Sequence, residues 1–349
     1  MVNVRRFGQV CVLAFGMGVG AAVASASGVA GADSSTDWLA SVDSLLSGAT
    51  LPAASSGLDL AFSYDGFTLI QEGSATAHTA TGEYGLAIAA GSGAYAYAGG
   101  GLGNFAEAQG VNAHAVAGGL PGDTNANFDT AIDIGNNDLP STGAADGAYA
   151  GNGDLGGGSG TGSYDTAIDI GNNTNGASGG GNEGAFAGAG GLGGVSGDGN
   201  HDFAIDLGNN SGLFDGADAL GGSNNVASQV GTITGYDEGV FAGFGGDNNV
   251  AISNANYSGE YFGTYAELGN NNYASVFGPE NSQAVAFEGD HNVAVVLDPF
   301  GSEGSYADSG YGFSNDVTEV LFAHGTTAAV TADNVYDILT ALGHLTGTL

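Results

Sequence analysis

The sequence predicts an all-β fold, a β-solenoid of the β-roll or β-helix type with short capping helices at its ends. Three observations support this. Short segments of alternating side chains recur between residues 80 and 300, Gly, Asn, Ser and Asp fill the intervals, and one ten-residue string returns twice. Such intervals are typical of tight turns. A solenoid is favoured over hairpins or a sandwich because the same side chains return at nearly the same offsets.

Residues 1–32 have the pattern of a secretory signal peptide. Arg5 and Arg6, the only Lys or Arg residues, precede an apolar run over residues 10–24, and small residues suited to cleavage follow. The run is short for a membrane helix, which needs about 20 apolar residues; an uncleaved anchor is the alternative. We therefore expect a secreted protein, extracellular or at the cell surface, with no membrane span in its mature form.

The expected mature chain is strongly acidic. Cleavage would remove both Arg residues and the one cysteine, Cys11, and leave all 37 acidic residues, so we expect neither disulfides nor ordinary salt bridges. Nucleic acid is excluded as a partner because phosphate binding requires basic side chains. Gly makes up 68 of the 349 residues, which leaves disorder as an alternative. The regular order of the residues argues against disorder.

Residues 33–79 are expected to cap the N-terminal end of the solenoid. Asp37 can cap a short helix with four apolar residues on one face, Trp38, Val42, Leu45 and Leu46. A hairpin should follow over residues 58–70, with its turn at Asp65-Gly66. Solenoids need such atypical terminal elements to cover their exposed edges.

Residues 80–300 are expected to form the solenoid. Units such as Leu86–Ala89 and Tyr95–Ala98 begin 9 or 10 residues apart, so a coil of two strands would take about 18 to 20 residues. The string Phe128–Asn137 returns as Tyr164–Asn173 and His201–Asn210, at offsets of 36 (164 − 128) and 37 (201 − 164). Each copy would then span two coils. Alanine alternating with larger apolar residues suits a thin solenoid, and the Gly-Asn-Asn ends should form amide ladders between coils.

The long repeats contain the candidate site. If Ile132, Ile168 and Ile205 face the core, strand alternation places two acidic columns on the outside. Stacked like charges repel, and carboxylate oxygens suit calcium. The alternative is that these aspartates are solvated and serve solubility and turn capping. The expected calcium ligands are Asp129, Asp133, Asp165, Asp169, Asp202 and Asp206.

Residues 301–349 are expected to cap the C-terminal end. Asp333 can begin a helix, Gly343 can end it, and four apolar residues would share one face, Val335, Ile338, Leu339 and Leu342.

Catalytic motifs are not evident. No serine elbow, phosphate loop or dinucleotide fingerprint is present, and the six histidines, at positions 78, 114, 201, 291, 324 and 344, lack zinc-site spacing. Clustered carboxylates leave a carbohydrate-active β-helix enzyme as the alternative function. An active site is normally a single, unrepeated constellation. Carboxylates off the repeat register would therefore favour the enzyme, and unbroken ladders a structural protein.

The string Gly188–Gly194 and the Gly-Asn-Asn repeats are similar to the secreted Gly/Ala/Asn-rich proteins of mycobacteria, PE-PGRS-like in composition but without the N-terminal Pro-Glu domain. The repeats also resemble trimeric adhesin heads. The resemblance covers about residues 80–300 and implies an envelope or extracellular location, with envelope or host surface components as partners. We expect a secreted, non-enzymatic structural or surface-interaction protein, with an acidic face that calcium stabilises. Its oligomeric state is left open.

Overall fold

A computed structural model of the chain describes fifteen stretches of the sequence. They are residues 59–119, 126–137, 146–151, 162–173, 183–188, 199–210, 216–231, 239–254, 263–278, 281–297, 304–310, 312, 314–321, 327–329 and 336–340. All of them belong to one of two compact units, Ser56–Leu349. The expected signal peptide and the helix after Asp37 lie outside the described residues.

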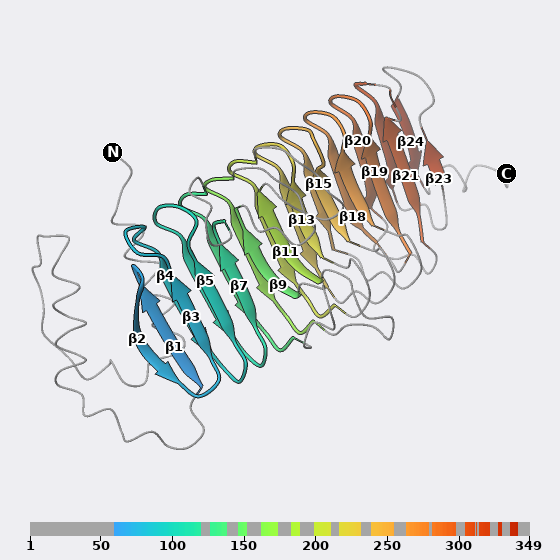
Figure 1. The fold of residues 1–349 in the computed structure, drawn as a ribbon. Coiled ribbons are helices and arrows are strands. Elements are labelled where there is room, and N and C mark those ends of the chain that lie inside the picture. Colours follow the sequence, from blue (N-terminus) through green and yellow to red (C-terminus); the bar gives the residue numbers. More distant parts are fainter. Residues whose placement is uncertain are drawn as a thin grey trace, which may run out of the picture. The chain divides into compact units, whose positions relative to one another are not determined.

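Two sheets make up the described unit, and from β3 to β24 the chain alternates between them (Figure 1). Sheet A contains, in spatial order, β2 (Phe67–Glu72), β1 (Leu60–Tyr64), β4 (Leu86–Ala90), β6 (Phe105–Gln109), β8 (Thr130–Ile134), β10 (Thr166–Ile170), β12 (Phe203–Leu207), β14 (Val226–Val230), β16 (Val250–Ser253), β18 (Tyr273–Phe277), β20 (Val293–Leu297), β22 (Val317–Leu321) and β24 (Tyr336–Thr340). Sheet B contains β3 (Thr76–Thr79), β5 (Tyr95–Ala98), β7 (His114–Ala117), β9 (Asp146–Ala150), β11 (Glu183–Gly188), β13 (Ala217–Leu220), β15 (Val240–Gly243), β17 (Thr264–Glu267), β19 (Gln283–Phe287), β21 (Tyr306–Gly310) and β23 (Thr327–Ala329). From β4 in sheet A and throughout sheet B, neighbouring strands are parallel, which confirms the predicted β-solenoid.

Each coil holds one strand of each sheet, and the coils differ in length. The coil from β4 to β6 takes 19 residues (105 − 86), whereas the coil from β8 to β10 takes 36 (166 − 130). Strands β8, β10 and β12 are direct neighbours, with Ile132 opposite Ile168 and Ile168 opposite Ile205. Each long repeat is therefore one enlarged coil, and the prediction of two coils per repeat is wrong. Extra residues between strands are tolerated because loop closure costs little more as a loop lengthens.

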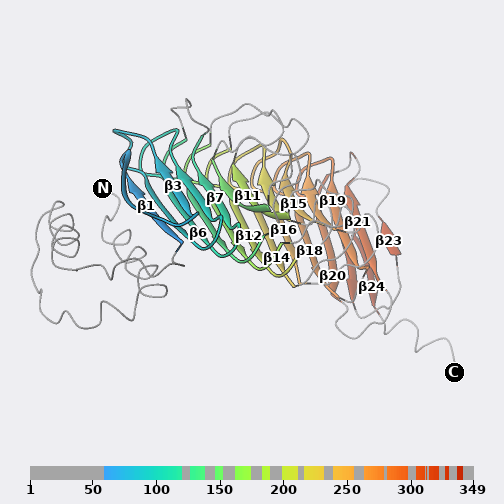
Figure 2. The ribbon, with the colours of Figure 1, turned by 60° about the horizontal axis from the view of Figure 1, so that its bottom comes forward.

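Alanine lines the interior of both sheets. Ala131, Ala167 and Ala204 are fully buried at equivalent positions of β8, β10 and β12, and sheet B repeats this pattern from Ala96 to Ala307. From β8 to β22 the larger residues of sheet A alternate with them and lie half-exposed on the outer face. Figure 2 shows the strands from a second direction. The narrow space between the sheets explains the pattern, because close packing at these positions leaves room for alanine and not for isoleucine.

The corner that precedes sheet A has the same backbone geometry in coil after coil. Two positions before each strand from β4 to β22, one residue adopts a left-handed conformation, as at Tyr84 (φ 55°) and Asn315 (φ 63°). Glycine takes this place at Gly103, where a Cβ atom would meet the ring of Phe128 at 2.8 Å. The repeated turn keeps successive strands in register. Asn, which tolerates positive φ, takes this place four times, and Tyr, Phe or His takes it five times.

The two ends match the prediction only in part. The hairpin is present: β1 and β2 pair antiparallel, and β1 also pairs antiparallel with β4. At the other end the sequence predicted a helix after Asp333, but β24 is a strand that pairs with β22. The coils thus continue beyond residue 300. A short apolar segment fits a strand as well as a helix, and pairing with the open edge of β22 decides between them.

Candidate functional site: aspartates inside the solenoid

The six predicted site aspartates lie inside the solenoid, not on its surface. Asp129, Asp133, Asp165, Asp169, Asp202 and Asp206 are each at most 1% exposed. The isoleucines predicted to face the core, Ile132, Ile168 and Ile205, lie half-exposed on the outer face of sheet A. The predicted orientation of these strands is therefore wrong. Alanine and aspartate share the inward side because both fit the narrow space, and isoleucine does not.

The first aspartate column belongs to a ladder that runs through most of the described coils. We call it the inner Asx ladder. Its members are Asn104, Asp129, Asp165, Asp202, Asn225, Asn249, Asn272, Asn292 and Asp316. At each link the backbone N–H of one member donates to the side-chain Oδ1 of the member before it, over 2.7 to 3.2 Å. The ladder satisfies one buried N–H per coil, just before sheet A begins.

Asparagine and aspartate differ in this ladder at their second side-chain atom. The Nδ2 of Asn104 donates to the carbonyl oxygens of Gly99 and Ala126, both at 2.9 Å. At the corresponding position the Oδ2 atoms of Asp129, Asp165 and Asp202 are buried and accept no hydrogen bond. An ionised carboxylate there would leave a buried charge without a donor, which is costly.

Protonation resolves this conflict. Desolvation raises the pKa of Asp129 to about 8, with the charge of Asp165 adding to the effect. Desolvation also raises the pKa of Asp165 to about 7 and that of Asp202 to about 8. A neutral carboxyl group has one O–H donor and can replace the amide of asparagine. At neutral pH Asp129 and Asp202 are therefore mostly protonated, and Asp165 is about half protonated.

The second column uses a different solution. Asp133 Oδ2 accepts hydrogen bonds from the backbone N of His114 at 2.5 Å and from Nδ2 of Asn137 at 2.7 Å. The same four-residue link joins Asn173 to Asp169 at 2.5 Å and Asn210 to Asp206. The second asparagine of each Gly-Asn-Asn therefore points inward and donates to its own aspartate.

The first asparagine of each Gly-Asn-Asn forms the predicted turn ladder. The Nδ2 and backbone N of Asn136 donate to Oδ1 of Asn172 at 2.9 and 3.0 Å, and Asn172 bonds to Asn209 in the same way. These amides are exposed, and each one links its coil to the next. The prediction of amide ladders between coils is confirmed.

Calcium binding by the six aspartates stays a prediction. Within the described stretches, no group of three or more His, Cys, Asp or Glu side chains is arranged to hold a metal ion. An ion that entered the interior would have to displace the protons of the first column or the amide partners of the second. Calcium that binds there should therefore raise the melting temperature more at pH 8 than at pH 5.

One carboxyl that the sequence did not single out is Asp218 in β13. It lies at the outer side of sheet B, in register between Phe186 and Phe241, and is 1% exposed. Desolvation raises the pKa of Asp218 well above its usual value, and the charges of Glu267 and Asp206 add to this. Its Oδ1 accepts no hydrogen bond. The only sequence signal was an acid at a position where neighbouring coils have an aromatic residue.

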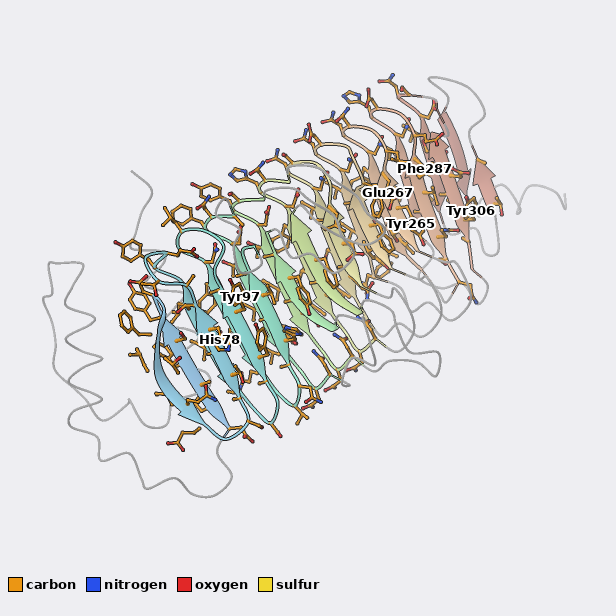
Figure 3. The ribbon with its side chains drawn as sticks, in the orientation of Figure 1. His78, Tyr97, Tyr265, Glu267, Phe287 and Tyr306 are labelled. Atoms are coloured by element: carbon orange, nitrogen blue, oxygen red, sulfur yellow. The ribbon has the colours of Figure 1, made fainter. Side chains whose placement is uncertain are left out.

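Aromatic rings form a stack around this position. Tyr149 and Phe186 stack at 4.9 Å, and Phe241 and Tyr265 at 5.3 Å. Tyr265 and Glu267 both belong to β17, and Figure 3 labels them in sheet B. The hydroxyl of Tyr149 lies 3.0 Å from Nδ1 of His114. Desolvation lowers the pKa of His114 to about 4. His114 is therefore neutral at pH 7 and belongs to the aromatic stack.

Comparison with known proteins gives no match to any protein family, curated protein or solved structure. Within the described stretches, no helix has the length and apolar character to cross a membrane.

Proposed function

We propose that the chain is a secreted, non-enzymatic structural or surface-interaction protein. The supporting observation is the inner Asx ladder, which runs from Asn104 to Asp316 without a break in its hydrogen bonds. A repeated, buried ladder stabilises a scaffold and does not form a concave catalytic site. The signal-peptide pattern of residues 1–32 supports export.

Fractionation of the producing cells tests this proposal. An antibody against the solenoid should detect the chain in the medium or surface fraction, shortened by about the length of residues 1–32. Deletion of residues 1–32 should retain it inside the cell. Detection of the unaltered chain only in the cytoplasm would contradict the proposal.

A second candidate function, a carbohydrate-active enzyme, is favoured by Asp218. This buried acid with a raised pKa interrupts a column of aromatic residues, and the charge of Glu267 raises its pKa further. A protonated carboxyl paired with a second carboxylate is the arrangement used in glycoside hydrolysis. Phe241 lies in register between Asp218 and Tyr265, and Glu267 follows Tyr265 by two residues in β17.

The test is a screen of polysaccharides for release of reducing ends by the wild-type chain and by Asp218→Asn. Loss of activity in Asp218→Asn, with the melting temperature retained, would support the enzyme. Asp165→Asn provides the matched control, because it removes a buried acid from the ladder. Absence of turnover by the wild-type chain leaves the structural proposal in place.

A further inference from the structure

The outer faces of the two sheets are unequal. In the middle of sheet B, from β7 to β15, large outer residues are covered, with Val116, Tyr149, Phe186, Leu220 and Phe241 each at most 6% exposed. On sheet A the outer residues are half-exposed, and several exceed this, including Ile170 at 43% and Phe277 at 42%. Sheet A therefore presents an apolar surface that the rest of the described chain does not cover.

This surface lacks charge over seven consecutive strands, β8 to β20. In its middle column the residues between Glu107 and Glu319 are four isoleucines, two serines and one valine. The two flanking columns over the same strands hold Thr, Val, Ile, Leu, Phe and Tyr. An uncharged stretch is notable in a chain with 37 acidic and two basic residues. Glu107 and Glu319 mark its two ends.

We propose that a second copy of this chain packs face to face on the outer surface of sheet A between β8 and β20. The inference deepens the proposed structural role by naming its partner. Parallel strands in constant register form straight columns, and an identical face related by a twofold axis supplies the same columns in return. Two such sheets can pack about 10 Å apart with interdigitated side chains.

The size of the surface fits a dimer. Seven strands at about 4.8 Å spacing and five residues at about 3.3 Å give roughly 560 Å² per copy in projection. The two copies together would bury about 1,100 Å², which exceeds the ~1,000 Å² expected of a specific interface. The surface is also at the upper end of what a monomer usually exposes. Because the face is uncharged, the acidic groups of the two copies do not have to meet within it.

The test is the oligomeric state of the full mature chain in 0.15 M salt, measured by sedimentation velocity and light scattering. Wild type should be a dimer, and Ile168→Glu/Ile205→Glu should be a monomer with an unchanged circular dichroism spectrum. The fold should accept these changes because Glu107 and Glu319 occupy the same column. The control Leu102→Glu/Val111→Glu adds equal charge at exposed turn positions and should stay dimeric.

Two outcomes would overturn the inference, a monomeric wild type and a dimer that persists in Ile168→Glu/Ile205→Glu. A monomeric wild type that dimerises only after deletion of residues 33–58 would assign the face to the chain's own N-terminal segment. Binding of monomeric wild type to zwitterionic lipid vesicles would assign the face to a lipid surface instead. None of these measurements depends on export or catalysis, so the inference and the proposed function can fail separately.

Discussion

The coils that contain β8, β10 and β12 and those that contain β16, β18 and β20 solve the same packing problem with different chemistry. In the first group the inner Asx ladder holds Asp129, Asp165 and Asp202, and in the second it holds asparagine. After the shared alanine, the following inward position holds aspartate in the first group and Ser253, Val276 or Val296 in the second. The same narrow interior therefore holds titratable carboxyl groups in one region and only non-titratable side chains at the same positions in the other.

The difference shows which part of the ladder is indispensable. Every member must present an acceptor, Oδ1, to the N–H of the next coil. The second atom can vary if it provides a donor, either the amide of asparagine or the proton of a neutral carboxyl. Folding of the aspartate coils therefore depends on pH in a way that folding of the asparagine coils does not.

The largest expected effect comes from breaking the inward packing that both regions share. Ala204→Ile places three extra carbons between the sheets, where Ala204 is 0% exposed. It should lower the free energy of unfolding by about 3 kcal/mol, the upper end of the usual cost of overpacking. The neighbouring Ile205→Ala removes only half-exposed surface and should cost about 1 kcal/mol. Urea unfolding followed by circular dichroism distinguishes the two variants. Equal destabilisation would contradict the inward and outward assignment.

The next largest effect is expected when the asparagine coils are converted into aspartate coils. Asn249→Asp/Asn272→Asp/Asn292→Asp should lower the melting temperature at pH 8, where the new carboxylates are either ionised and buried or protonated at a cost. At pH 4 the neutral acids should replace the amides with little loss. A change of 1 kcal/mol corresponds to about 2–4 °C for a domain of this size. A melting temperature equally lowered at both pH values would show that shape, and not charge, limits these positions.

The sequence predicted the architecture but not the direction of the side chains. Repeats and turn residues were enough to identify the solenoid, the hairpin at Asp65-Gly66 and the Gly-Asn-Asn ladder. Because burial of aspartate is normally costly, we expected the aspartates on the outside. Ala131 shares a strand face with Asp133 and indicated the opposite orientation. The interior admits small side chains such as alanine and excludes Ile132. The period of 36 residues is compatible with one long coil or two short ones, so pairing of strands far apart in sequence had to decide.

The third prediction concerns the reverse conversion, in which the aspartates of the inner Asx ladder are replaced by asparagine. The three carboxyls of the ladder have a pKa of about 7 to 8 when folded and about 4 when unfolded. The folded chain binds more protons in that interval, so stability should be full below pH 4 and fall as pH rises to 8. Asp129→Asn/Asp165→Asn/Asp202→Asn should remove most of this slope.

Thermal melts at pH 4, 6 and 8 measure the slope directly. The triple asparagine variant should melt several degrees above wild type at pH 8 and close to it at pH 4. Addition of calcium at pH 8 distinguishes calcium binding by these aspartates from proton binding alone. If calcium stabilises wild type and not the variant, the ions bind at the ladder. A pH slope that the substitutions leave unchanged would show that the protons are stored elsewhere.

The smallest effect concerns an aspartate on the surface, where the sign should reverse. Asp290 accepts hydrogen bonds from the backbone N of Asn270 at 2.7 Å and from its Nδ2 at 3.0 Å, and these bonds lower the pKa of Asp290. Its contribution to stability should therefore be present above the unfolded pKa of about 4 and be lost as pH falls through the lower folded value. Asp290→Asn keeps an acceptor and loses only the charge, so the change in melting temperature at pH 7 should be a small decrease that vanishes near pH 3. An increase at pH 7 would place Asp290 with the buried aspartates, and the contrast between proton-storing interior positions and ionised turn positions would not hold.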